Sequence, residues 1–302
     1  MKTEPALMII CLVLMLFACQ HKPGYDQSVD VNLYFTKLGD LPDQIDESSG
    51  LSLLNNQLWT HNDSGDDPVL YQLDPGSGTY LNQVFVAGAG NVDWEDLTRD
   101  EHYFYLGDFG NNSGIRQDLT IYRLAIGNLN ANLDTITVSG EIEFSFEDQN
   151  RFDFDFNKHN FDCEAMIESG ENLYLFSKNH VDKQCRLYQL SKQDETAKAR
   201  LKGTFDVDGK ISGADYSEAD CILVLLGYNY NDWTSFRPFV WLFSEFEGDN
   251  FFDGKQQRID LPIRVQTEGI VLDTQGMVLI SSEAENRGKG HLFQLDINKW
   301  LE

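Results

Sequence analysis

The sequence predicts an all-β fold, a β-propeller built from four-stranded blades. Three observations predict it: a recurring phrase of three apolar strands, intervals of 46 to 69 residues between its copies, and an aromatic residue in every third strand. Such periods, with short aromatic-rich strands and turns of Gly, Asn and Asp, are typical of propeller blades. The phrase begins at Ser49, Glu95, Glu164, Ser212 and Glu268, and its third strands are residues 70–73, 121–124, 187–190, 240–243 and 292–295.

The number of blades follows from the number of copies. Fourth strands are expected near residues 81–86, 138–146, 201–207 and 257–261, but the last copy ends with the chain. An additional strand at residues 31–38 is expected to complete that blade and to close the ring, which would remove an exposed edge. Five blades are therefore favoured. Six blades remain the alternative, because the interval of 69 residues is long enough to contain another.

The chain is expected to begin with a lipoprotein signal peptide at residues 1–18. An apolar run at residues 6–18 is too short for a membrane span of roughly 20 residues. Leu16, Phe17 and Ala18 lead directly into Cys19 and resemble a bacterial lipobox, which predicts lipidation of Cys19. A cleaved ordinary signal peptide and an uncleaved anchor remain alternatives. Residues 19–30 would be a polar tether to a propeller domain at 31–302, lipid-anchored in the cell envelope, at the outer membrane.

Composition narrows the range of partners. The formal net charge is −26, and 41% of the residues are hydrophobic. A chain this acidic is a poor candidate for nucleic acid, whose phosphates require basic surfaces. The membrane is expected to be reached through the lipid alone, and the domain is expected to be monomeric. After the leader and Cys19, three cysteines remain, which allows either one disulfide with a free thiol or three buried thiols.

Acidic side chains are expected to converge at one mouth of the central channel. Neighbouring strands in a blade are antiparallel, so the start of each innermost strand and the end of each second strand share one face. Oxygen ligands without clustered His or Cys suit Ca²⁺ or Mg²⁺, and Ca²⁺ is the expected cofactor. A purely structural network involving Lys178, Arg116 or Arg123 is the alternative. The predicted metal ligands are Glu95, Glu164, Glu268, Asp108, Glu283 and Asn62.

Several motifs resemble one family. They are WTHNDSG at 59–65, DWED at 93–96, GDFGNN at 107–112 and DCEA at 162–165. These motifs resemble those of uncharacterised bacterial secreted β-propellers, which typically read WTHNDSG, DWED, GDxGDN and DAEA. Asn111 and Cys163 depart from that pattern. The chain is more distantly similar to gluconolactonase-like and phytase-like propellers, and that resemblance implies calcium held by carboxylates and Asn from several blades.

The loops on the same face also provide candidate ligand-binding residues. These are His61, Asp63, Asp93, Asn112, Arg116, Asp162 and Lys178. The sequence has no GxSxG, HExxH or phosphate-cradling glycine motif. The expected function is binding of a divalent cation and a small ligand, with metal-assisted hydrolysis of a phosphate ester or lactone as the reaction class. The alternatives are a non-catalytic envelope scaffold or recognition module, and a metal-free glycosidase that uses paired carboxylates.

Overall fold

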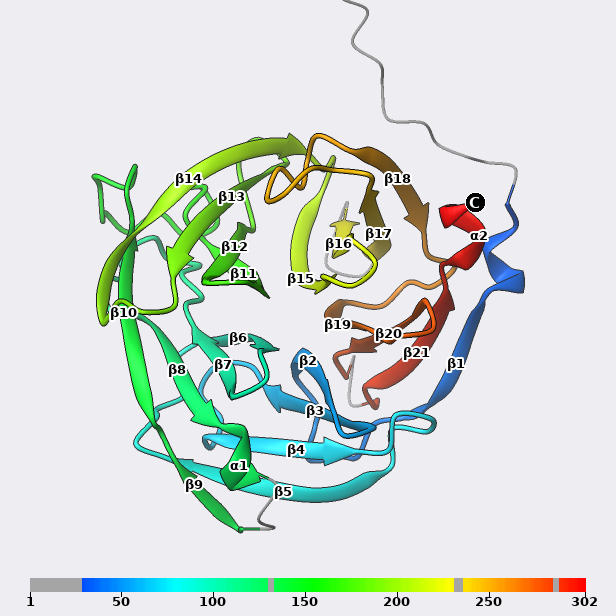
Figure 1. The fold of residues 1–302 in the computed structure, drawn as a ribbon, viewed down its shortest axis with the longest axis horizontal. Coiled ribbons are helices and arrows are strands. Elements are labelled where there is room, and N and C mark those ends of the chain that lie inside the picture. Colours follow the sequence, from blue (N-terminus) through cyan, green and yellow to red (C-terminus); the bar gives the residue numbers. More distant parts are fainter. Residues whose placement is uncertain (1–28, 130–132, 231–235, 285–287) are drawn as a thin grey trace, which may run out of the picture.

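The regular structure of the domain is almost entirely β-strand, and the strands are arranged around a central axis (Figure 1). The structure is a computed structural model that describes residues 29–129, 133–230, 236–284 and 288–302. The predicted signal peptide, Cys19 and most of the predicted tether lie outside these residues. No helix in the described part of the chain is long and apolar enough to cross a membrane.

The strands form four sheets, in which most neighbouring strands are antiparallel and follow one another in the chain. The first sheet contains β2 (Ser48–Leu54), β3 (Gln57–Asn62), β4 (Val69–Leu73), β5 (Tyr80–Ala87) and β9 (Thr135–Thr137). An eight-stranded sheet joins β6 (Trp94–Arg99), β7 (Tyr103–Asp108), β8 (Leu119–Ala125) and β10 (Gly140–Phe146) to β11 (Cys163–Ser169), β12 (Asn172–Ser177), β13 (Gln184–Ser191) and β14 (Thr196–Asp206). The third sheet contains β15 (Lys210–Ser217), β16 (Ile222–Tyr230), β17 (Phe236–Ser244) and β18 (Lys255–Asp260).

The last sheet combines the two ends of the described chain. It contains β19 (Thr267–Leu272), β20 (Met277–Ser282), β21 (His291–Asp296) and β1 (Phe35–Asp40), which pairs antiparallel with β21. The strand predicted at 31–38 therefore begins later than expected. Its first residues form the short helix η1 (Val31–Leu33), because the side chain of Asp30 caps the backbone N–H of Asn32.

The long interval between the second and third copies contains no second set of four strands among its described residues. It contains helix α1 (Ile126–Leu129), strands β9 and β10, and a long loop at 147–162. Strand β9 pairs in parallel with β5 of the preceding sheet, and β10 pairs in parallel with β14 of the following group. The extra residues thus connect neighbouring groups of strands.

The innermost strands contact one another in a closed circuit, in the order β2, β6, β11, β15, β19 and back to β2 (Figure 1). The apolar core is divided among the spaces between neighbouring groups. One cluster, for example, combines Trp59 and Leu70 of the first group with Trp94 and Phe104 of the next. Helix α2 (Asn298–Leu301) adds buried Trp300 to the cluster between the last two groups. The core therefore joins neighbouring groups of strands, and the loops that leave these groups can carry a site.

The three cysteines of the domain are free thiols. Cys163 and Cys185 are buried, and Cys221 is exposed. Burial raises the pKa of the Cys163 thiol well above its ordinary value. Of the two arrangements that the sequence left open, neither is found, because no disulfide forms and one thiol reaches the surface.

Candidate functional site

The innermost strands share one irregularity that positions the site. Each of the five changes register with its neighbour at the same level of the ring. Such a bulge leaves a residue without a partner and turns its side chain to a new direction. The residues at the shifts are Ser49 with Gly50, Glu95, Glu164, Ser212, and Glu268 with Gly269. Three carboxylates and two hydroxyls therefore stand at equivalent positions around the axis.

The mouth above these residues is a cavity of about 520 Å³. Among the predicted site residues, seven line it: Asp63, Asp93, Asn112, Arg116, Glu164, Lys178 and Glu268. The lining also includes Asn111, His180, Lys210, Tyr228 and Gln266, which the sequence analysis did not select as site residues. Acidic side chains from several groups of strands thus line one cavity, as the sequence analysis expected. They are divided between more than one cluster, which the next paragraphs describe.

The ammonium group of Lys178 stands among the carboxylates. Its Nζ lies 2.8 Å from Oε2 of Glu164 and 5.6 Å from the centre of the Tyr228 ring. Although burial alone would lower the pKa of Lys178, the adjacent Glu164, with Glu268, holds it well above its ordinary value. The Lys178 side chain is therefore positively charged and belongs permanently to the mouth of the ring. A common ion between Glu95, Glu164 and Glu268 was expected, but Glu164 is already paired with Lys178.

Two buried carboxylate oxygens beside this lysine have no hydrogen-bond partner. They are Oε1 of Glu164 and Oε2 of Glu268. The other oxygen of Glu268 accepts a hydrogen bond from Nε2 of Gln266, which also donates to Glu283 at 2.6 Å. Burial, and then the charge of Glu268, raise the pKa of Glu283 to about 9. Glu268 and Glu283 thus share one amide group, and the charge of Glu268 disfavours ionisation of Glu283.

Asp63, Asp93 and Glu95 form a separate group, which we call the carboxylate triad. One oxygen from each lies within 4.8 Å of the others. The backbone of Gly110 makes room for it, because a Cβ there would stand 2.0 Å from Oε1 of Glu95 and 2.4 Å from Oδ2 of Asp93. Hard oxygen ligands at this spacing fit a divalent cation such as Ca²⁺ or Mg²⁺.

The triad is assembled by two neighbouring loops that Asn91 ties together. Its Nδ2 donates to the carbonyl oxygen of Asp63 at 2.7 Å, and its Oδ1 accepts from the backbone N–H of Trp94 at 3.2 Å. The loop after β3 is thereby held against the loop that enters β6. Asp93 is fixed from the other side, because its backbone N–H donates to Oδ1 of Asp108 at 3.1 Å.

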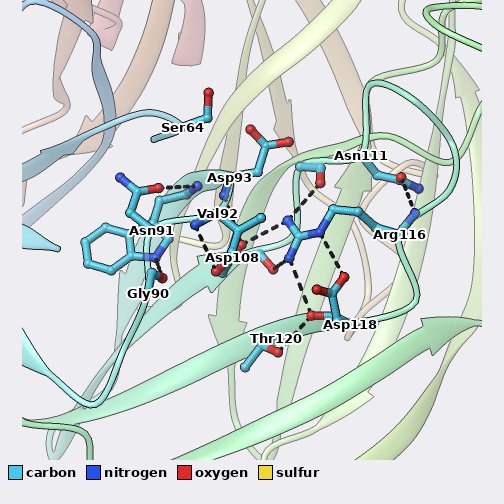
Figure 2. A network of polar contacts seen from close by, with 12 residues as sticks. Ser64, Gly90, Asn91, Val92, Asp93, Asp108, Asn111, Arg116, Asp118 and Thr120 are labelled. Atoms are coloured by element: carbon cyan, nitrogen blue, oxygen red, sulfur yellow. Dashed lines mark hydrogen bonds and ion pairs between the residues drawn. The ribbon is translucent and has the colours of Figure 1, made fainter. Parts of the chain in front are cut away.

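Asp108 belongs to this supporting network and not to the carboxylate triad (Figure 2). Its Oδ1 lies 2.9 Å from Nη1 of Arg116, which also donates to the carbonyl oxygen of Gly110 at 3.0 Å. The Arg116 guanidinium further pairs with Asp118. The prediction that Asp108 is a metal ligand is therefore replaced by a supporting role, because its carboxylate is occupied by an arginine and by backbone N–H groups.

His61 and Asn62 lie deeper than the cavity. His61 is fully buried, its Nδ1 donates to the carbonyl oxygen of Asn62, and its ring meets Trp94 edge-on at 5.7 Å. Burial lowers the pKa of His61 to about 4, so the imidazole is neutral. The Asn62 amide nitrogen donates to the carbonyl oxygen of Gln44, while its buried Oδ1 has no partner. Neither residue lines the cavity as a ligand-binding group.

Asp162 is completely buried behind the cavity wall. Its Oδ1 accepts from the backbone N–H of Asn111 at 2.7 Å, and its Oδ2 lies 2.7 Å from Nε2 of His180. Nδ1 of His180 in turn lies 2.7 Å from Nζ of Lys210. Asn112, at the same wall, accepts through its carbonyl oxygen from Nε2 of His159 at 3.2 Å. Asp162 therefore positions other residues and does not face the ligand space itself.

The triad should make the ion-free protein less stable as pH rises. Burial, and then neighbouring carboxylates, raise the pKa of Asp63 to about 7 and that of Asp93 to about 6. The folded state therefore binds more protons than the unfolded state between about pH 4 and pH 7, and the free energy of unfolding falls across that window. We expect the melting temperature in chelator to drop on the order of 5 °C more than in an Asp63→Asn/Asp93→Asn variant. Parallel pH profiles for the two proteins would contradict this electrostatic account.

Comparisons with known proteins support the fold. No protein-family profile matches the sequence, and no curated protein matches it. An exo-β-1,3-galactanase from Phanerochaete chrysosporium has a TM-score of 0.54 at 9% identity, over 88% of this chain and 65% of that one. A protein described as exported from Bacteroides fragilis gives 0.45 at 11% identity, over 89% and 97%. The RRP9 WD40 repeats give 0.38 at 9% identity, over 82% and 67%.

These likenesses concern architecture. The likeness to the galactanase, at 9% identity, shows the fold alone, which is all-β and propeller-like. The chain spans less than two thirds of the length of the galactanase chain, at 65%.

Proposed function

We propose that the mouth of the ring binds a divalent cation, Ca²⁺ in the first place, through Asp63, Asp93 and Glu95. The observation that carries this proposal is the convergence of one oxygen from each residue within 4.8 Å, over a glycine that leaves them space. Carboxylates held this close raise one another's pKa unless a cation neutralises them. Lys178 does not neutralise the triad alone, because it is paired with Glu164.

The cavity supports a ligand-binding role for the same ion. Ca²⁺ takes six to eight oxygen ligands, so three carboxylates leave positions for water or for an oxygen of a small molecule. Because Asp63 and Asp93 line the cavity, those positions face it. A cation placed so can polarise a phosphoryl or carbonyl oxygen and activate a water. The reaction class we propose is metal-assisted hydrolysis of a phosphate ester or lactone.

Calorimetric titration with Ca²⁺ tests the site directly. We expect wild-type protein to bind the ion, and a hundredfold excess over the dissociation constant to add about 2.7 kcal/mol to the free energy of unfolding. Asp93→Asn should weaken binding at least about tenfold, because it removes a charged ligand. Gly110→Ala should weaken binding similarly without changing any charge, because its Cβ would displace the Glu95 and Asp93 carboxylates.

The matched control is Asp153→Asn, which removes an exposed carboxylate from a nearby loop of the domain. Asp153 pairs with Arg151 at the surface, and its side chain is 73% exposed. Binding by this variant should equal that of the wild type. Equal Ca²⁺ affinities in wild type, Asp93→Asn and Gly110→Ala would remove the triad from the proposal.

A metal-free glycosidase is the second candidate. It is favoured by two close carboxyl groups, Asp63 and Asp93, whose pKa values are both raised by burial, because a glycosidase uses a pair of carboxyl groups as acid and base. The galactanase shows that a fold of this kind can carry glycoside hydrolysis. Glycosidase activity that persists in chelator would support this candidate. Cation binding without turnover of any substrate would instead support the recognition-module alternative.

The architecture and location complete the proposal. We propose a five-bladed propeller in which β1 closes the last blade, because β1 pairs with β21 and the innermost strands contact one another in a closed circuit. We also propose that Cys19 anchors the protein by a lipid to the outer membrane. The apolar run at 6–18 and the lipobox-like residues before Cys19 support that anchoring.

A further inference from the structure

Phe156 is an exposed aromatic residue at the mouth of the ring. It is 54% exposed, and it lines the same cavity as Asp63 and Asp93 of the carboxylate triad. Tyr228, the other aromatic residue in the described lining, is only 4% exposed. An aromatic ring in contact with water is unfavourable, and a ligand that covers its face gains free energy from that burial. Phe156 therefore offers the cavity's ligand an apolar surface.

The backbone on both sides of Phe156 is attached to the neighbouring loop. The N–H of Asp155 donates to the carbonyl oxygen of Ser113 at 3.0 Å, and the N–H of Asn157 donates to that of Asn112 at 3.0 Å. Because these two hydrogen bonds flank Phe156, its position at the cavity is fixed before a ligand arrives. A contact with this residue consequently carries little ordering cost.

Neutral polar side chains near Phe156 have no hydrogen-bond partner in the described part of the chain. Asn112 and Ser113 line the cavity and make their hydrogen bonds through their carbonyl oxygens, which leaves the amide and the hydroxyl available. Ser64 also lines the cavity, and it is bonded within the protein through its backbone N–H. The buried Oδ1 of Asn157 is likewise without a partner. Amide and hydroxyl groups both donate and accept, so they match a ligand that carries hydroxyl groups.

The basic side chains of the cavity are already in contact with other groups of the protein. Arg116 and Lys178 each pair with a buried carboxylate, and Lys210 contacts His180. An anionic ligand would have to compete with these contacts, and it would also meet the carboxylates that line the cavity. A neutral ligand is therefore favoured over an anion.

We infer that the ligand of this cavity is a carbohydrate, whose ring stacks on Phe156 and whose hydroxyl groups bind the ion of the carboxylate triad and the neighbouring side chains. A sugar ring combines an apolar C–H face, which suits an aromatic ring, with hydroxyl groups that both donate and accept. Two adjacent hydroxyl groups can also supply two oxygens to a Ca²⁺ ion that has open positions. This inference deepens the proposed function and rests on it, because the bound ion would hold the sugar hydroxyl groups.

Saturation-transfer NMR with neutral sugars tests the subsite. The probes are the methyl glycosides of glucose, galactose and mannose, and adenine is the competing probe because it is flat and has no hydroxyl group. With saturating Ca²⁺ we expect transfer from the protein to at least one sugar, strongest at the C–H protons of one face of its ring. Chelator should weaken the affinity for that sugar about tenfold or more, because the ion and the sugar increase each other's affinity by the same factor.

Two variants separate the aromatic contact from the rest of the loop. Phe156→Ala should weaken sugar binding about tenfold, because the stacking contact is lost. Its Ca²⁺ affinity should stay within about twofold of wild type, which also shows that the variant is folded. The matched control is Phe154→Ala, because Phe154 belongs to the same loop and is 72% exposed but does not line the cavity. This control should bind the sugar and Ca²⁺ like the wild type.

The possible outcomes distinguish the inference from the proposed function. The inference is overturned by transfer to no sugar while Ca²⁺ is bound, by transfer to adenine alone, or by equal sugar affinities in Phe156→Ala and wild type. Sugar binding that requires Phe156 but is unchanged in chelator supports the carbohydrate and contradicts its coupling to the ion. Absence of Ca²⁺ binding overturns the proposed function instead.

Discussion

Replacing Lys178 by methionine should lower the free energy of unfolding by about 3–5 kcal/mol, since it removes one partner of a buried ion pair. The side chains of Lys178 and Glu164 are only 10% and 4% exposed. Without the ammonium, Glu164 would keep two buried oxygens without a positive partner, and Glu268 would lose its nearest neutralising charge. Urea denaturation at pH 7.5 in chelator measures the difference without a contribution from bound cation.

A second variant separates charge from packing in this experiment. Lys178→Met/Glu164→Gln removes both charges and should recover much of the loss, because a neutral amide is less costly to bury than an unpaired carboxylate. The matched control is Lys183→Met, because the Lys183 side chain is 66% exposed and lies 3.7 Å from Asp208 at the surface. If Lys178→Met unfolds at the same urea concentration as the wild type, Lys178 does not neutralise the centre of the mouth.

Deleting residues 1–39 should cost about 3 kcal/mol or more and lower the melting temperature by about 10 °C, because aromatic contacts and most of an edge strand are lost together. The ring of Phe35 stacks on Phe293 at 5.2 Å, and Tyr34 meets Trp300 edge-on at 5.5 Å. The deletion also exposes the backbone groups of β21 that now pair with β1.

The control is a deletion of residues 1–28, which leaves η1 and β1 intact. This shorter deletion should melt like the full chain when both are purified without membrane. Calorimetric scans of the two truncated proteins give the comparison. Equal melting temperatures would contradict the proposal that β1 closes the last blade.

The repeat pattern predicted the strands well, because each strand is a short apolar run between turn residues and can be recognised from neighbouring residues alone. The third strands expected at 70–73, 187–190 and 292–295 lie within β4, β13 and β21. The start of β1 was wrong by four residues, because the Asp30 cap that forms η1 is a side-chain effect that apolar spacing does not reveal. The parallel pairing of β10 with β14 joins segments that are far apart in the chain, so a pattern of neighbouring residues does not predict it.

The site was predictable in position but not in its internal pairing. Strand alternation placed Asp63, Asp93 and Lys178 on one face, where they line one cavity. Which carboxylate pairs with which cationic side chain depends on differences of a few ångströms between groups of strands, so the sequence did not reveal that Asp108 pairs with Arg116. His180 and Lys210 belong to no motif, and their contact joins residues that are 30 positions apart. Asn91 was also missed, although its place two residues before Asp93 in the loop entering β6 was a usable signal.

The outer rim of the ring has a consequence for how this protein behaves at high concentration. An outermost strand with free N–H and C=O groups invites pairing with a second molecule and hence aggregation. In this domain the free edge of each outermost strand is protected in its own way. Strands β10 and β14 pair with each other. Strand β5 pairs with β9, a strand of only three residues. Strand β1 has a bulge between Lys37 and Gly39, and β18 carries Lys255, Arg258 and Asp260. Strand-to-strand polymerisation is thereby disfavoured on every described side of the ring.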